Sequence, residues 1–296
     1  MQQAAILDKV DGVMGVMGVM GAAIQEAAEV PALTHREAGR LASVELERFL
    51  ALVESLGEDD WSKPTACTLW NVKQMVAHAA GACAGWAGWR EFKRQYSPLA
   101  HRPYRKAGMS QLDTINHIQV TDRAGASPAA IIAELRRVGP RAIATRQKLP
   151  GPLRAIRVPL PVLGFVRIDY LTDLIYPRDM WMHRLDLCRA TNREMVQTPE
   201  HDGRIVALVM RDLAASLRSK LGDASVVYTL TGTAGGSWRL GSKSRPTADI
   251  QMDVLDFNRL ASGRITAREA QARSIVQLTG DTALALKALE NTSVPY

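Results

Sequence analysis

Two histidines and one aspartate have the residue types and spacing that metal binding requires. Asp179 and His183 are four residues apart in a segment expected to be helical, so their side chains share one face, about 5–6 Å apart. His78 lies beside the apolar stripe of a separate expected helix. The three together would leave an open coordination position, as catalytic Zn²⁺ sites do. An acid and a histidine at this spacing are more often a surface pair, so spacing alone leaves both interpretations open.

Four helices are expected to position these side chains. They cover residues 34–57, residues 71 to at least 83, residues 127–149 and residues 168–190. A capping box of Asn71 and Gln74 begins the second helix. We expect Pro140 to bend or break the third helix, and Pro177 to kink the fourth just before Asp179. Helices of this length with long polar or Pro-rich connections favour a bundle.

The pattern changes after residue 190. Residues 199–221 are expected to form a connector helix, and SVVYTLTGTAGGSWRLG then alternates as two strands joined by a Gly-rich turn would. One further strand with a short helix, another strand in SIVQLTGD and a closing helix over residues 282–289 follow. These elements predict a small α+β domain. We therefore divide the chain into residues 1–33, 34–195 and 196–296.

Composition limits the class of protein. Of 296 residues, 47% are apolar and 23% charged, which excludes disorder across the whole chain. Three cysteines without a CxxC pair favour a reducing cytoplasm. No stretch reaches the roughly 18 apolar residues of a membrane span. Residues 1–33, which include the repeat VMGVMGVMG, are expected to be a mobile extension, or alternatively an apolar flap over a pocket or a neighbouring subunit.

One segment accounts for the positive charge of the chain, which is 37 − 30 = +7. Residues 135–168 contain no acid and eight basic residues: Arg136, Arg137, Arg141, Arg146, Lys148, Arg154, Arg157 and Arg167. They indicate either a solvated surface or an electropositive rim that attracts carboxylates. The segment lacks interleaved aromatic residues and the chain has no reader motif, so nucleic acid is not an expected partner.

Most other residues with chemical potential are expected to be structural. Solvent exposure is predicted for His35, His101, His117 and His201. Core or pocket-wall positions are predicted for Trp61, Trp70, Trp86, Trp89 and Trp181. Cys83 and Cys188 each follow a candidate ligand histidine by five residues, which turns them away from the metal face, so we expect them to be buried and inert.

Two stretches of the sequence resemble a known family. The segments DDWSKPTACTLWNVKQMVAHAAG and YLTDLIYPRDMWMHRLDLCRATNR are similar to the signatures of the mycothiol-dependent maleylpyruvate isomerase family. LTGTAGGSWRLG, DFNRLASGR and VQLTGDTALALKAL resemble the C-terminal domain of that family. The resemblance implies a DinB-like four-helix bundle followed by a small sterol-carrier-like α+β domain. It also implies a divalent metal, usually Zn²⁺, held by His78, Asp179 and His183.

The same resemblance implies an enzyme with mycothiol as thiol cosubstrate. In the family's isomerisation the thiolate adds to a cis double bond, the bond rotates, and elimination gives the trans isomer; thiol transfer to a small electrophile is the related outcome. The substrate would be an anionic unsaturated acid or an electrophile, and the protein a monomer or homodimer. The alternative is a non-catalytic metal-containing protein whose C-terminal domain binds an apolar ligand.

Four further residues are candidates for this chemistry. Arg184 and Arg264 are candidate catalytic residues, the second as an arginine that reaches the cleft from the C-terminal domain and binds a carboxylate. Arg178 and Trp181 are candidates for binding the thiol. For Arg184, an ion pair that orients a ligand carboxylate is an equally good interpretation.

Overall fold

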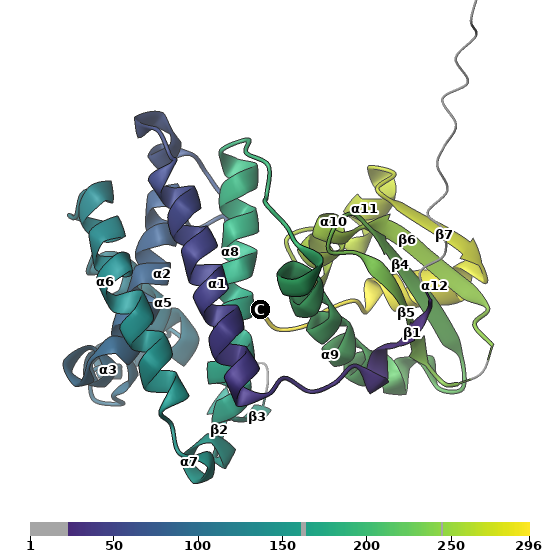
Figure 1. Ribbon diagram of the computed structural model, residues 1–296, viewed down its shortest axis with the longest axis horizontal. Coiled ribbons are helices and arrows are strands. Elements are labelled where there is room, and N and C mark those ends of the chain that lie inside the picture. Colours follow the sequence, from purple (N-terminus) through teal and green to yellow (C-terminus); the bar gives the residue numbers. More distant parts are fainter. Residues whose placement is uncertain (1–22, 161–163, 244) are drawn as a thin grey trace, which may run out of the picture.

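A helical bundle and a smaller α+β unit lie side by side in the computed structural model (Figure 1), which describes residues 23–160, 164–243 and 245–296. Four long helices build the bundle, namely α1 (His35–Glu54), α2 (Val72–Ala87), α6 (Pro128–Gln147) and α8 (Tyr176–Ala190). Short elements connect them: a 3-10 turn (Glu58–Ser62), α3 (Trp89–Tyr96), α4 (Arg102–Lys106), α5 (Gln111–Thr121), α7 (Gly151–Ala155), and a hairpin of β2 (Arg157–Leu160) and β3 (Gly164–Arg167). The predicted fold class, a helical bundle followed by an α+β unit, is confirmed.

The bundle core comes from the apolar stripes of α1, α2 and α6. α2 packs against α6, α3 and α5, and its apolar residues are almost all buried. Phe49 of α1, Met75 of α2 and Leu135 of α6 share one core with Leu187 of α8. The opposite face of α8 carries Trp181 and neighbours that belong to the core of the α+β unit. α8 therefore connects the two units and also carries the candidate ligands.

Capping fixes the start of the helix that carries His78. The Asn71 carboxamide oxygen accepts a hydrogen bond from the Gln74 backbone N–H at 2.9 Å, and the Gln74 side chain accepts one from the Asn71 backbone N–H at 2.9 Å. The predicted capping box is thus confirmed.

Replacement of Asn71 by Ala should lower the free energy of unfolding by about 0.5–2 kcal/mol, because the Gln74 backbone N–H loses its side-chain acceptor. Urea denaturation followed by circular dichroism measures this loss. Asn71→Asp keeps an oxygen acceptor and should stay close to wild type; a loss as large as that of the Ala variant would show that the cap is not the cause.

Pro140 does not break its helix, and Pro177 lies at the start of its helix and not within it. α6 continues through Pro140, which lies on its exposed side, so the carbonyl of Arg136 that loses its helical partner faces water. Ahead of Pro177 the chain forms a π-helical segment (Tyr170–Ile175), and α8 begins only at Tyr176. Pro177 therefore lies in the first turn of α8, where a missing N–H is tolerated.

The α+β unit is a five-stranded sheet with helices on it. Its strands are β1 (Gln25–Glu26), β4 (Ser225–Thr231), β5 (Gly236–Gly241), β6 (Ala248–Asp253) and β7 (Val276–Gly280), in the order β1-β5-β4-β6-β7. The helices are α9 (Arg204–Leu221), α10 (Val254–Ala261), α11 (Ala267–Ala272) and α12 (Thr282–Glu290). Ala248, Ile250 and Met252 of β6 are buried and alternate with exposed residues, so one face of this strand packs on the core. The domain boundaries and the likeness to sterol carriers remain predictions.

The described residues before α1 are ordered, so the expectation of a mobile extension is wrong for residues 23–33. β1 pairs in parallel with β5, with Gln25 opposite Trp238 and Glu26 opposite Arg239. Ala27 and Val30 are buried in the core of the α+β unit. The VMGVMGVMG repeat lies outside the described residues. Burial of these two apolar side chains and the Glu26–Arg239 ion pair explain the order.

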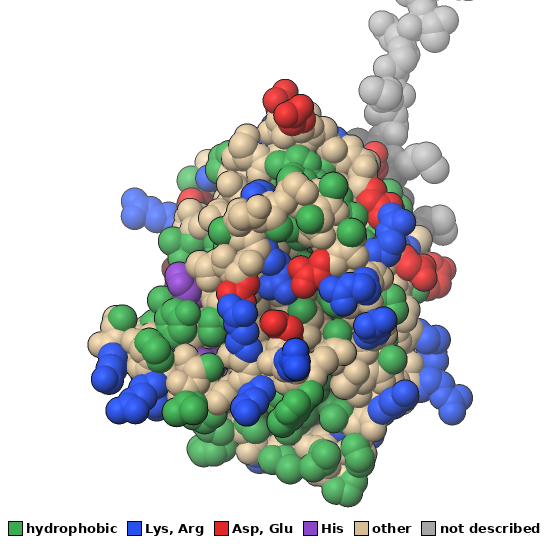
Figure 2. Space-filling view, turned by 90° about the vertical axis from the view of Figure 1, so that its left-hand side faces the viewer, with side chains coloured by type: hydrophobic (Ala, Val, Ile, Leu, Met, Phe, Trp, Pro, Cys, Tyr) green, Lys and Arg blue, Asp and Glu red, His purple; other side chains and the backbone are tan. Residues whose placement is uncertain are grey.

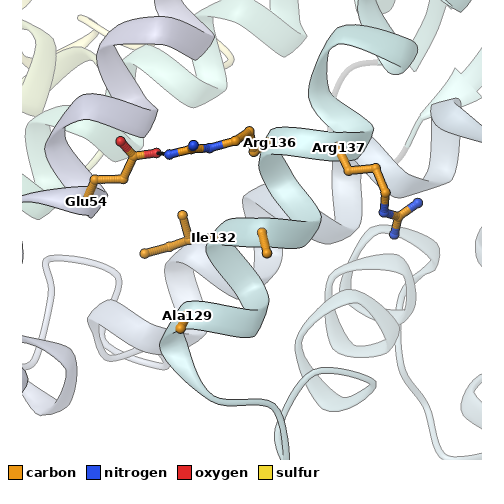
Figure 3. Close-up of a pocket in the computed structure, with 6 residues that line it drawn as sticks. Glu54, Ala129, Ile132, Arg136 and Arg137 are labelled. Atoms are coloured by element: carbon orange, nitrogen blue, oxygen red, sulfur yellow. Dashed lines mark hydrogen bonds and ion pairs between the residues drawn. The ribbon is translucent and has the colours of Figure 1, made fainter.

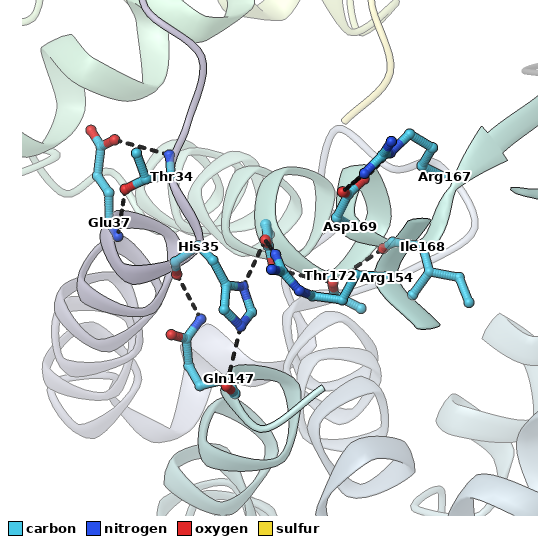
Figure 4. A network of polar contacts seen from close by, with 10 residues as sticks. Thr34, His35, Glu37, Gln147, Arg154, Arg167, Ile168, Asp169 and Thr172 are labelled. Carbon is cyan, nitrogen blue, oxygen red and sulfur yellow. Dashed lines mark hydrogen bonds and ion pairs between the residues drawn. The ribbon is translucent and has the colours of Figure 1, made fainter. Parts of the chain in front are cut away.

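A polar network anchors the start of α1 to the end of α6 and to the π-helical segment (Figure 4). His35 contacts the Asp173 carboxylate through Nδ1 at 2.8 Å and the Gln147 backbone carbonyl through Nε2 at 3.1 Å. Arg154 donates to the same Asp173 at 3.3 Å. The expectation that His35 is merely solvated is therefore wrong.

No helix in the described part of the chain is both long and apolar enough to cross a bilayer.

Candidate metal centre

His78, Asp179 and His183 converge between α2 and α8. The Asp179 carboxylate lies 3.5 Å from His78 Nε2 through Oδ2 and 3.2 Å from His183 Nε2 through Oδ1. The two imidazole rings are 5.1 Å apart at their centroids and nearly perpendicular. Both histidine side chains are buried, whereas the Asp179 side chain is 31% exposed. The cluster thus has one side open to solvent.

The donor set fits a divalent metal of the zinc type. Zn²⁺ binds histidine nitrogen and carboxylate oxygen at about 2.0–2.2 Å, so neighbouring ligand atoms of a tetrahedral site are roughly 3.3–3.4 Å apart. The Asp179 carboxylate approaches the two imidazole nitrogens with different oxygens, at 3.5 and 3.2 Å, and one donor atom from each of the three residues lies within 4.8 Å of the others. Three such ligands would leave one coordination position open.

The Asp179 carboxylate remains ionised because of its histidine neighbours. Burial by itself would raise its pKa, but the charge and hydrogen bonds of His183 and His78 outweigh burial and hold the pKa well below the usual range. For His183, burial would lower the pKa, and the contact with Asp179 raises it well above the usual value. The cluster is therefore built to place positive charge next to this carboxylate.

A second carboxylate orients His183. Asp186 Oδ2 lies 3.4 Å from His183 Nδ1, and Arg264 from the α+β unit donates to both Asp186 oxygens at 2.6 Å. A carboxylate on the second ring nitrogen is the usual partner of a metal-bound histidine, because it fixes the tautomer and the ring plane. The Arg264 guanidinium also lies 3.6 Å from Cys67 Sγ. Sequence reasoning proposed Arg264 but missed Asp186 and Cys67.

Trp70 covers the histidine side of the cluster. Its ring centroid is 4.7 Å from that of His78 with the planes tilted by 30°, and 6.1 Å from that of His183. Trp70 is thus the wall residue that the sequence predicted. Trp89, by contrast, is 73% exposed and belongs to no core.

Three of the proposed site residues point away from the metal ligands. Arg184 donates to Glu45 at 2.7 and 3.1 Å and to Asp202 at 2.7 Å, not to Asp179 or Asp186. Trp181 donates to the same Asp202 at 2.8 Å. Consecutive residues on a helix point in different directions. Arg184, which directly follows His183, therefore faces another side of α8.

Arg178 likewise faces the α+β unit. Its Nη1 donates to Asp212 at 2.8 Å and to the Pro295 carbonyl at 2.9 Å. The contacts of Arg178, Trp181 and Arg184 therefore hold the two units together. None of the three contacts a ligand of the candidate metal centre.

Two more histidines differ from the expectation of solvent exposure. His201 is buried and contacts Glu45 at 2.8 Å, in a second cluster with Asp202. The guanidinium of Arg184 lies between these two acids, which makes the cluster an ion-pair network and not a cation site. His101 is buried against the Gln95 carbonyl, while His117 is exposed as predicted.

The two cysteines predicted to be inert are buried. Burial raises the pKa of Cys83 and of Cys188 to about 11, so both stay protonated thiols near neutral pH. Cys67 is the half-buried one of the three.

Most of the basic segment is solvated surface. Arg137, Arg141, Lys148 and Arg157 are exposed, and Figure 2 shows Lys and Arg side chains spread over the bundle end of the molecule. A surface hollow of about 580 Å³ lies on the outside of the bundle, lined by Glu54, Ala129, Ile132, Ala133, Arg136 and Arg137 (Figure 3). It contains no residue of the metal centre. Arg146 alone among the eight basic residues is buried.

Comparisons with known proteins give a family match and a likeness of fold. Residues 42–188 match the family described as mycothiol maleylpyruvate isomerase N-terminal domain. No curated protein matches the sequence significantly. A crystal structure of a His-to-Ala mutant of the mycothiol-dependent maleylpyruvate isomerase superposes with a TM-score of 0.52 at 12% identity, over 83% of this chain and 93% of that one. A second structure of that isomerase gives 0.51 at 14% identity, over 79% and 90%. At such identities the likeness establishes the fold.

Proposed function

Because residues 42–188 place this chain in the mycothiol maleylpyruvate isomerase family, we propose that it is a metal-dependent enzyme that uses a low-molecular-weight thiol. The observation that carries the proposal is the convergence of His78, Asp179 and His183 with one side open to solvent. Mycothiol is the thiol we propose, because both similar structures are mycothiol-dependent isomerases.

His78, Asp179 and His183 would hold the metal, which we propose to be Zn²⁺. A thiol bound to Zn²⁺ is deprotonated, whereas a free thiol with a pKa of about 8.5 is largely protonated at pH 7. The chain's own residues prepare this chemistry. Asp186 fixes the ring plane of His183, and Trp70 shields the imidazoles from water.

The proposed reactions are cis–trans isomerisation of a small unsaturated acid and thiol transfer to an electrophile. Isomerisation needs no redox partner: a C–S bond forms, the former double bond rotates, and the same C–S bond breaks. Arg264 is the arginine of the α+β unit that lies nearest to this chemistry, through Asp186. We propose it as a residue that positions Asp186 and, through it, His183.

Cobalt substitution tests the proposal directly. Protein loaded with Co²⁺ and titrated with mycothiol should develop a thiolate-to-cobalt charge-transfer absorption band. S-methyl mycothiol, which has no ionisable thiol, is the matched control and should give no band. If neither mycothiol nor cysteine nor glutathione produces the band, the protein is a metal-containing binding protein and the enzymatic proposal is wrong.

A thiol-dependent activity screen then identifies the reaction. Unsaturated keto acids and small electrophiles are assayed with and without mycothiol, and isomerisation is followed by loss of the cis isomer. Activity that persists without any thiol would contradict the proposed role of the cosubstrate.

A further inference from the structure

Of the four buried arginines among the described residues, three pair with an acid and Arg146 does not. Arg123 pairs with Glu134, Arg178 with Asp212, and Arg184 with Glu45 and Asp202. Arg146, in the last turn of α6, is only 5% exposed, yet it forms no ion pair with an acid of the described residues, and its Nη1 has no hydrogen-bond partner there. A buried charge without a counter-charge is costly, so an anion is the expected complement.

The Arg146 guanidinium lies over the ring of Tyr176, whose hydroxyl contacts two further aromatic side chains. The Arg146 Cζ atom lies 4.7 Å from the ring centroid of Tyr176 on α8. The Tyr176 hydroxyl accepts from Trp86 Nε1 at 2.6 Å and lies 2.7 Å from the Tyr96 hydroxyl. Each tyrosine has one O–H group, and only one of these two groups donates in the contact between the hydroxyls. One O–H donor is therefore left over, next to a guanidinium with an unused N–H.

Both tyrosines keep their protons. Burial raises the pKa of Tyr176, and it raises the pKa of Tyr96 well above the usual value. The guanidinium is always charged. The cluster thus offers hydrogen-bond donors and a positive charge at neutral pH.

The cluster of Arg146, Tyr96 and Tyr176 and the candidate metal centre lie at different heights along the same pair of helices, α2 and α8. His78 contacts His183, and Trp86 contacts Tyr176, so α2 and α8 run in opposite directions with these four residues facing each other. Asp179, a candidate ligand, follows Tyr176 by three positions, which is a rise of about 4.5 Å along the helix axis. One small molecule is long enough to reach both places.

We propose that Arg146, with the Tyr96–Tyr176 hydroxyl pair, is a binding subsite for a carboxylate of a small organic acid whose other end faces the metal centre. A carboxylate matches the planar fork of a guanidinium and accepts from a hydroxyl at the same time. A single cation favours one singly charged group over a phosphate dianion. The inference deepens the proposed function, on which it rests, by naming an anionic substrate class.

Succinate is a suitable probe, because it carries two carboxylates and no reactive double bond. Calorimetric titration of the purified full-length protein, in a buffer without carboxylates, should show binding of succinate and at least about tenfold weaker binding of the neutral analogue succinamide. Arg146→Met should weaken succinate binding by about tenfold or more. Arg141→Met removes the same charge from the exposed side of α6 and should change it less than about twofold.

Each result supports or overturns the subsite. Wild-type affinity for succinate in folded Arg146→Met would overturn it, since the anion would then bind elsewhere, the metal included. Equal binding of succinate and succinamide by the wild type would overturn it as well. If Arg146→Met does not fold, Arg146→Lys and Tyr176→Phe replace it, and both should bind succinate at least about threefold more weakly. These outcomes are independent of the cobalt experiment, so failure of the subsite and failure of the thiol chemistry are distinguishable.

Discussion

Protein carrying His183→Ala should be purified with less than about a tenth of the metal found in the wild type, for which we expect one ion per chain. His183 supplies one of the three ligands of this candidate centre, and its Nε2 lies 3.2 Å from Asp179. Two remaining ligands with an open side to solvent cannot compete with a chelator in the buffer. Metal analysis by plasma mass spectrometry after gel filtration measures the content. His78→Ala should give the same result.

Two further variants sharpen this test. His117→Ala removes an exposed histidine of α5 and should leave the metal content unchanged. Asp186→Asn keeps all three ligands but weakens the support of His183 Nδ1, so metal affinity should fall about 10- to 100-fold in a competition titration. Full metal content in both His78→Ala and His183→Ala would show that the three residues are not the ligands.

Helical spacing, which is a local signal, indicated that His78, Asp179 and His183 could meet, whereas their assignment as metal ligands came from the family resemblance. Asp179 and His183 are one turn apart on a helix, and a capping box fixes where the helix of His78 begins. The strands of the α+β unit were equally readable, since β6 alternates buried and exposed residues. Such patterns depend on a few neighbouring residues, so they can be recognised without knowledge of the tertiary structure.

Most of the missed features depend on contacts between distant segments. Asp186 lies three residues after His183 on α8, a local spacing, but its pairing with Arg264, 78 residues later, comes from the fold. α5 was missed because its buried face includes Thr114 and Gln119, which hide the apolar period. β1 has two residues and exists only through its pairing with β5. Local periodicity contains none of this information.

Replacement of Glu45 by Ala should lower the free energy of unfolding by about 3–5 kcal/mol. Glu45 is fully buried in α1, and its two oxygens accept from Arg184 of α8 at 2.7 and 3.1 Å and contact His201 at 2.8 Å. Without this carboxylate, the guanidinium is left with Asp202 as its acidic partner, and the imidazole nitrogen loses its own. The cost arises because buried nitrogens of Arg184 and His201 lose their carboxylate partner.

The end of the same helix provides the matched control. Glu54 pairs with Arg136 at the exposed surface of the bundle, so Glu54→Ala removes an ion pair that water already screens and should cost less than about 1 kcal/mol. Urea denaturation followed by tryptophan fluorescence compares the two variants, and Trp181, which donates to Asp202, reports on the network itself.

Because Glu45, Arg184 and Asp202 come from α1, α8 and the segment before α9, the Glu45 variant should also loosen the α+β unit from the bundle. Protease cleavage between α8 and α9 should then become faster in Glu45→Ala than in Glu54→Ala. Equal unfolding free energies and equal cleavage rates in the two variants would mean that the buried network does not join the units.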